Sequence, residues 1–240
     1  MESASALPRP RPAIRAAAPL AITVVLAAVA LAWDLAGLDL PAMLALGDAR
    51  GFRLRGNWWL ESVMHDGARR LALVAFLALA YLAWRPSGPL RRFDGRERAQ
   101  MVAGTVLALA FTGLAKRSSL TSCPWDLAEF GGVATYVSHW QWGVADGGPG
   151  ACFPGGHASA ALAFVALATP GLVAPAGTPK RRFAWLALAV ALAAGLALGA
   201  AQTLRGAHYP SHTLWTALAC WGAAWASHAL VFYKRGQFPR

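Results

Sequence analysis

The sequence predicts an all-α, polytopic membrane protein with six transmembrane helices and an interfacial helix between the first and the second. Of its 240 residues, 57% are hydrophobic and only 14% are charged, too few to cover a soluble domain of this size. The hydrophobic residues form long continuous runs, whereas the strands of a membrane β-barrel alternate apolar and polar residues. One helical membrane domain therefore accounts for the chain.

The apolar runs place the six helices within a domain that spans residues 13–233. The expected spans are residues 13–35, 71–84, 101–115, 157–173, 184–203 and 212–233. The first run also has the basic flank of a signal peptide, but it is longer than a signal core and no clear cleavage site follows it. We therefore expect a retained first helix between two cytoplasmic tails, residues 1–12 and 234–240.

Two connecting segments are longer than ordinary turns. Residues 36–68 mix basic and aromatic side chains, among them Arg55 and Trp58, which is typical of an amphipathic segment lying in the membrane interface. His65 and Asp66, at the end of this segment, are interpreted as a polar cap of the second helix. Residues 116–156 form a long loop rich in Gly and Trp, and long loops commonly carry functional sites.

The distribution of positive charge orients the helices. The net charge is +11, and most of the 22 Lys and Arg residues fall in the tails and connections that this layout assigns to one side. The positive-inside rule places that side in the cytoplasm, so both termini are expected inside a bacterial inner membrane. Arg69 and Arg70 lie on the outer side, against the rule. Because the basic residues are scattered among connections, no nucleic-acid partner is expected.

The segment CFPGGHAS, residues 152–159, stands where the long loop meets an apolar helix. A helix start presents unpaired backbone N–H groups and the positive end of the helix dipole, which together favour an anion. Gly155 and Gly156 allow a ligand to approach the backbone closely, and His157 can transfer a proton near neutral pH. The segment predicts a phosphate site at the periplasmic face.

Three polar clusters are expected at the same outer depth. They are residues 116–124, 154–157 and 202–212, and they read KRSSLTSCP from Lys116, PGGH from Pro154 and QTLRGAHYPSH from Gln202. Ionisable residues at membrane depth are costly and mark functional sites. Their order and spacing resemble the three motifs of the type-2 phosphatidic acid phosphatase superfamily, Lys-x6-Arg-Pro, Pro-Ser-Gly-His and Ser-Arg-x5-His-x3-Asp. The resemblance covers about residues 100–220.

The resemblance implies a metal-free, two-step reaction without any cofactor. His208 is expected to attack phosphorus and form a phosphohistidine, while His157 protonates the leaving oxygen and then activates water. The expected phosphate-binding residues are Lys116, Arg117, Arg205, Gln202, Gly155 and Gly156. An alternative is a zinc site formed by His157, His208 and His212, but the glycine turn and nearby cations favour phosphate.

The chain departs from the family pattern at five positions, one of which is Ala201 in place of the serine of the third motif. Cys123 and Gln202 stand where the family has arginines, Gly155 stands for a serine, and His212 stands for an aspartate. Arg117 and Arg205 are the expected substitutes for the two arginines. The strings CPWDL (123–127) and RGAHYPSH (205–212) look like a bacterial subgroup with the same replacements.

The replacement at His212 concerns the nucleophile directly, since the family's aspartate orients it. A neutral histidine can accept a hydrogen bond there, and Asp126 or Glu129 from the long loop is the expected alternative carboxylate. Cys123 and Cys152 lie in the same outer loop, so a disulfide is predicted in the oxidising periplasm, with two free thiols as the alternative.

The sequence therefore predicts a membrane lipid phosphatase. Its substrate is expected to be an isoprenoid pyrophosphate, a lipid A phosphate or a phospholipid phosphate within the lipid bilayer, and the sequence leaves that choice and the oligomeric state open. One alternative is a phosphotransferase that passes the phosphate to a second lipid. Another is a non-catalytic lipid-binding or transport protein, which His212 favours, whereas the set Lys116, His157 and His208 favours catalysis.

Overall fold

The computed structural model describes residues 12–233, so both predicted tails, apart from residue 12, lie outside the described part of the chain. The protein is predominantly helical. Its α-helices are α1 (Pro12–Leu35), α2 (Asp39–Leu44), α3 (Ala68–Trp84), α4 (Gly95–Ser118), α5 (Gly156–Leu162), α6 (Thr169–Leu172), α7 (Pro179–Leu204) and α8 (Pro210–Tyr233). A π-helix, η1 (Trp59–Gly67), leads into α3, and four 3-10 segments are η2 (Gly88–Arg92), η3 (Pro124–Asp126), η4 (Ala128–Phe130) and η5 (Ala163–Leu167).

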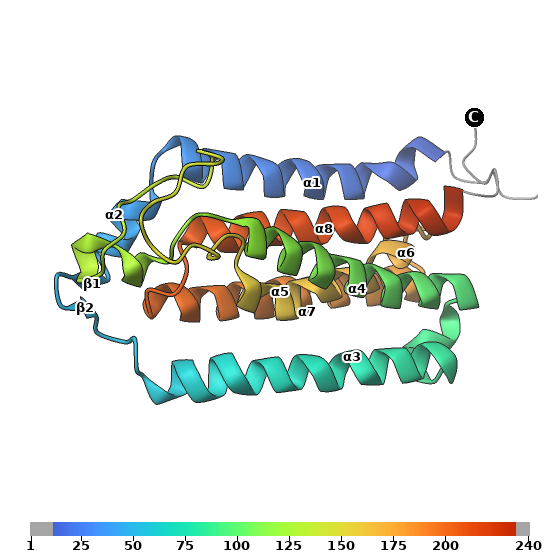
Figure 1. The fold of residues 1–240 in the computed structure, drawn as a ribbon. Helices are drawn as coiled ribbons and strands as arrows, with labels where there is room; N and C mark the ends of the chain where they lie inside the picture. The colour runs from blue at the N-terminus through green and yellow to red at the C-terminus, as the bar shows by residue number, and fades with distance from the viewer. Residues whose placement is uncertain (1–11, 234–240) are drawn as a thin grey trace, which may run out of the picture.

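The long helices run side by side, with α3 standing at one edge of the bundle (Figure 1). Helix α4 packs against α8, and α5 packs against α7. The core between them is built mainly from alanine and leucine, including Ala108 of α4, Leu162 of α5 and Ala217 of α8. Small residues let helices approach closely within a membrane, where packing rather than water drives their association.

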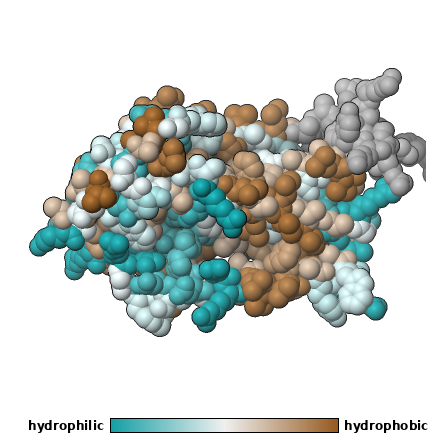
Figure 2. Space-filling model, in the orientation of Figure 1, coloured by the Kyte–Doolittle hydropathy of each residue, from teal (hydrophilic) through white to brown (hydrophobic). Residues whose placement is uncertain are grey.

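Four helical segments are long and apolar enough to cross a membrane: Ala17–Leu35, Trp59–Arg92, Gly95–Ser118 and Pro179–Leu204. The other two expected spans are not among them, since the apolar segment Gly156–Leu167 is shorter and α8 falls outside this set. Hydrophobic residues gather over the middle of one face, and hydrophilic residues cover the end near α2 and the hairpin (Figure 2). The protein is therefore helical and suited to a membrane.

Helix α4 begins earlier than the expected residue 101, because Asp94 provides a strong start signal. The Asp94 side chain accepts hydrogen bonds from the backbone N–H groups of Arg96 and Glu97, and the Glu97 carboxylate accepts one from the Asp94 N–H. This capping box satisfies the unpaired donors of the first turn. The helix consequently extends for 24 residues instead of the short run that hydrophobicity alone indicated.

Two other expected elements differ. The single helix expected at residues 157–173 is divided into α5, η5 and α6, and Pro170 lies in the first turn of α6, where it cannot donate the N–H that a continuous helix needs. Residues 36–68 do not form one interfacial helix. They form α2, an antiparallel hairpin of β1 (Gly47–Asp48) and β2 (Gly51–Phe52), and η1.

Helix α7 approaches its neighbours at two glycines. A Cβ atom on Gly195 would lie 2.4 Å from the Leu162 side chain of α5, and one on Gly199 would lie 2.3 Å from Thr213 Oγ1 of α8. Side chains at these two positions would push the helices apart. The two glycines thus set the position of α5 and of the start of α8.

We expect Gly199→Ala to destabilise the protein, because an extra methyl group in a closely packed contact costs about 1–3 kcal/mol. This corresponds to a melting temperature lower by about 3–10 °C for a domain of this size. Thermal unfolding in detergent, followed by tryptophan fluorescence, measures the change. Gly113→Ala in α4 is the matched control, since a Cβ there meets nothing within 4 Å. Equal melting temperatures for the two variants would contradict the expected contact.

Candidate active site

The three polar clusters meet at one end of the bundle. The end of α4, the start of α5 and the link between α7 and α8 bring Lys116, His157 and His208 together. The rings of His157 and His208 have centroids 5.9 Å apart, and the ring of His212 lies 5.7 Å from that of His208. A Cβ atom on Gly156 would lie 3.6 Å from Lys116 Nζ. One lysine and three histidines thus surround the start of α5.

The two glycines of the turn play different parts. The Gly155 N–H donates to Thr216 Oγ1 at 2.9 Å and to the carbonyl of His212 at 3.3 Å, so this amide is already occupied. The Gly156 N–H has no hydrogen-bond partner among the described residues. Gly156, rather than Gly155, therefore offers a backbone donor beside Lys116, and Gly155 connects α5 to α8.

His208 has the environment of a neutral histidine. Only 3% of its surface is exposed. Burial lowers the pKa of His208 well below its ordinary value of 6.5, because a charged ring there would lose its hydration, and nearby positive groups add to this effect. A neutral imidazole keeps an unprotonated nitrogen, which a nucleophile requires.

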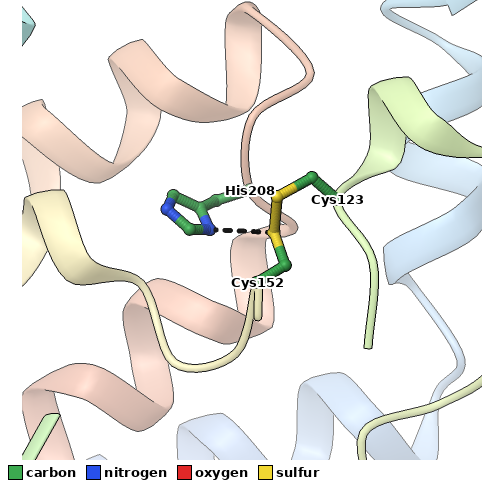
Figure 3. Close-up of side chains that lie close together, drawn as sticks. All are labelled: Cys123, Cys152 and His208. Atoms are coloured by element: carbon green, nitrogen blue, oxygen red, sulfur yellow. Dashed lines mark hydrogen bonds between the residues drawn. A yellow bond between two sulfur atoms is a disulfide. The ribbon is translucent and has the colours of Figure 1, made fainter. Parts of the chain in front are cut away.

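A disulfide joins Cys123 and Cys152 and lies directly against this histidine (Figure 3). His208 Nδ1 is 3.4 Å from Cys152 Sγ. A disulfide sulfur carries no proton, so the ring nitrogen is the donor in this contact, and the sulfur is a weak acceptor. A proton on Nδ1 leaves Nε2 as the nitrogen with a free lone pair. The disulfide, and not a carboxylate, thus contacts His208 Nδ1 in the described chain.

The two arginines expected to bind phosphate, Arg205 and Arg117, lie in different environments. Arg205 is 5% exposed, donates from Nε to the carbonyl of Arg55 at 2.9 Å and pairs with Glu61 Oε1 at 3.3 Å. Its Nη1 also lies 3.5 Å from Gln202 Oε1, so Arg205 and Gln202 form one unit. Arg117 is exposed and forms no hydrogen bond or ion pair within the described chain. The structure therefore brings Arg205, but not Arg117, into the site.

Neither expected carboxylate reaches the histidines. Asp126 accepts a hydrogen bond from the Cys123 N–H at 3.2 Å, and burial raises its pKa. Glu129 is exposed. His212 is fully buried, and neither of its ring nitrogens has a hydrogen-bond partner among the described residues. No described carboxylate therefore makes a hydrogen bond to His208 or His212.

Two carboxylates that sequence reasoning missed hold the start of α8 from outside the site. Asp39 accepts a hydrogen bond from the Ser211 N–H at 3.1 Å, next to His212. Asp34 lies 3.3 Å from His139 Nε2 and accepts a hydrogen bond from the Trp215 indole at 2.7 Å. Both aspartates are far from residues 205–212 in the chain, so no local pattern reveals the contacts. They fix the segment that carries His208.

A cavity of about 410 Å³ opens beside His157, between α3 and the core helices. His65 and Arg69 line it together with Gly156 and His157. A second cavity of about 500 Å³ shares Met64 and several other residues with the first and is lined by alanine, leucine and other apolar side chains. His65 therefore lines the site and is not only a polar cap of the helix. The sequence feature that could have revealed this is the basic pair at 69–70, which departs from the positive-inside rule.

A family model described as the PAP2 superfamily matches residues 98–236, which is more than half of the chain. The chain belongs to this superfamily. The matched region carries all three polar clusters, and membership indicates phosphatase activity on phosphate esters. Searches of curated proteins and of solved structures give no match. Helices α1 to α3 of this PAP2 protein lie outside the matched region.

We expect loss of the disulfide to lower phosphate-ester hydrolysis about tenfold, since small displacements of reacting groups reduce rates strongly. The test compares the double variant Cys123→Ser, Cys152→Ser with wild type, using a soluble chromogenic phosphate ester in detergent. Cys220→Ala is the control, because Cys220 is buried in the helix core and makes no disulfide. A double variant that hydrolyses the ester at the wild-type rate would contradict a positioning role for the disulfide.

Proposed function

We propose that this PAP2 protein is a membrane lipid phosphatase that hydrolyses a phosphate or pyrophosphate headgroup at the periplasmic face of a bacterial inner membrane. One observation carries the proposal. His208, buried and with its Nδ1 against the disulfide, lies 5.9 Å from His157 between ring centroids, Lys116 lies beside Gly156, and His157 lines a cavity that continues into an apolar one. This arrangement combines a nucleophile, an acid and a cation with a place for an amphiphile.

The reaction has two steps. His208 Nε2 attacks phosphorus, the bond from phosphorus to the leaving oxygen breaks, and His157 gives that oxygen a proton. His157 then takes a proton from water, which attacks the phosphohistidine and releases inorganic phosphate. Lys116, Arg205 and the Gly156 N–H stabilise the charge that develops on the phosphate oxygens. Each protein group returns to its starting state, and the scheme uses no metal.

The two adjoining cavities support a lipid as the substrate. The first has polar groups at the phosphate end, and the second continues along α3 and α7 between apolar side chains such as Leu71 and Val190. A phosphorylated lipid can place its headgroup at the first and its chain along the second. An isoprenoid pyrophosphate, a lipid A phosphate and a phospholipid phosphate all have this form.

The proposed topology has six spans, with α5–α6 and α8 added to the four segments that meet the length and composition of a membrane helix. The distribution of Lys and Arg favours cytoplasmic termini and a periplasmic site. The disulfide between Cys123 and Cys152 supports the same side, because the periplasm is oxidising and the cytosol is not.

Two further functions each have an observation in their favour. Because His208 is almost completely buried, water has little access to a phosphohistidine formed there. This favours transfer of the phosphate to a second lipid. The replacement of the family's aspartate by His212, without a hydrogen bond from His208 to any carboxylate among residues 12–233, favours a non-catalytic lipid-binding or transport protein. The following experiment separates them from hydrolysis.

Purified protein in detergent is expected to release phosphate from lipid phosphates in the presence of EDTA. His208→Ala should lower the rate by at least about a thousandfold, because the variant has no nucleophile. His228→Ala is the matched control, since His228 is also a buried histidine of the C-terminal region but lies near the other end of α8. Phosphate release is measured for a panel of lipids with both variants.

The alternative outcomes are distinct. Loss of release in EDTA would indicate a metal site and overturn the metal-free scheme. Transfer of labelled phosphate to an added acceptor lipid, without free phosphate, would identify a phosphotransferase. Binding of lipid phosphates without either reaction would identify a non-catalytic protein.

A further inference from the structure

One face of the η1–α3 helix is directed at the active site. Glu61, His65 and Arg69 follow one another at four-residue intervals, which places them about one turn apart on the same face. Glu61 pairs with Arg205 at 3.3 Å, the His65 ring lies 3.8 Å from the His157 ring between centroids, and Arg69 lines the same cavity as His157. This face belongs to the part of the chain outside the PAP2 match.

The two basic residues of this face have nitrogen atoms without a partner among the described residues. Arg69 is exposed to the cavity and forms no ion pair or hydrogen bond with any described residue, unlike Arg205. His65 Nδ1 lies 2.8 Å from Asp66 Oδ1, so that its N–H donates to the carboxylate, and in the imidazolium form Nε2 has a second N–H to donate. Guanidinium and imidazolium N–H groups in a cavity are suited to an anion.

The site consequently has two separate groups of anion-binding residues. The first group consists of Lys116, Arg205 and the Gly156 N–H around His208. The second consists of His65 and Arg69. His157 stands between them, with its ring centroid 5.9 Å from that of His208 and 3.8 Å from that of His65. In a diphosphate the leaving oxygen bridges two phosphorus atoms, so the acid that protonates it must lie between two phosphate positions.

We propose that His65 and Arg69 form a second phosphate subsite and that the substrate is therefore a lipid diphosphate. The inference rests on the proposed phosphatase function. The terminal phosphorus faces His208, and the inner phosphate, attached to the lipid, lies against His65 and Arg69. The bond between the bridging oxygen and the terminal phosphorus breaks, His157 protonates the bridging oxygen, and water releases the terminal phosphate from His208. The products are a lipid monophosphate and inorganic phosphate.

The subsite also explains why Arg69 lies on the outer side of the membrane. Basic residues are otherwise concentrated on the opposite side, and an exposed arginine there has no partner in the described chain. A substrate phosphate supplies the partner. A lipid monophosphate fills the first group alone and leaves the Arg69 guanidinium without an anion, so only a diphosphate uses both groups.

The test compares a polyprenyl diphosphate and the monophosphate with the same chain as substrates in detergent. Arg69→Gln is expected to lower kcat/KM about tenfold for the diphosphate, through the loss of one charge-assisted hydrogen bond, and to leave the monophosphate nearly unchanged. Arg70→Gln is the matched control, since Arg70 is the adjacent exposed arginine and does not line the cavity. It should leave both substrates unchanged. An equal loss for both substrates, or no loss in Arg69→Gln, would overturn the subsite.

A binding measurement keeps this test independent of turnover. Thermal shifts with methylenediphosphonate and with inorganic phosphate report the affinity for two phosphates or one. Wild type and Arg70→Gln should bind the diphosphonate more tightly than phosphate, and Arg69→Gln should lose that preference. If this holds without any hydrolysis, the subsite stands and the phosphatase function fails. If wild type hydrolyses the monophosphate but shows no preference for the diphosphonate, the subsite fails and the phosphatase function stands.

Discussion

The hydrogen bond from the Gly155 N–H to the Thr216 hydroxyl joins the start of α5 to α8, and the site depends on it. His157 follows this bond by two residues on one helix, and His212 precedes Thr216 by one turn on the other. The bond is buried, where water does not compete with it, and its loss would leave the Gly155 N–H with only the longer bond to the His212 carbonyl. This contact between two helices therefore holds His157 close to His212.

The part of the chain that precedes the PAP2 match completes the site rather than only anchoring it. Glu61 pairs with the buried Arg205, and Asp39 accepts a hydrogen bond from the Ser211 N–H at the start of α8. The π-helix η1 carries Glu61 and α2 carries Asp39, and π-helical segments occur frequently at functional sites. The family region thus supplies the reacting histidines, while the preceding helices supply their surroundings.

Much of the helical layout follows from the sequence, because a hydrophobic run must be a helix in a membrane. The expected spans 13–35 and 212–233 correspond closely to Pro12–Leu35 and Pro210–Tyr233. The same reasoning failed at residues 157–173, where Pro170 interrupts the hydrogen-bond ladder, and at residues 36–68, where hydrophobicity does not distinguish a hairpin from an interfacial helix. In both segments, local backbone geometry and hydrogen bonding determined the secondary structure.

The sequence by itself determined the family, the order of the three polar clusters and their common place at the helix ends, because these depend on spacing along the chain. Only the tertiary structure decided which groups face one another. It placed Cys152 Sγ against His208, His65 against His157 and Glu61 against Arg205, and it left Asp126 away from the histidines. Such contacts join segments distant in sequence, and helix packing, which has no local signature, determines them.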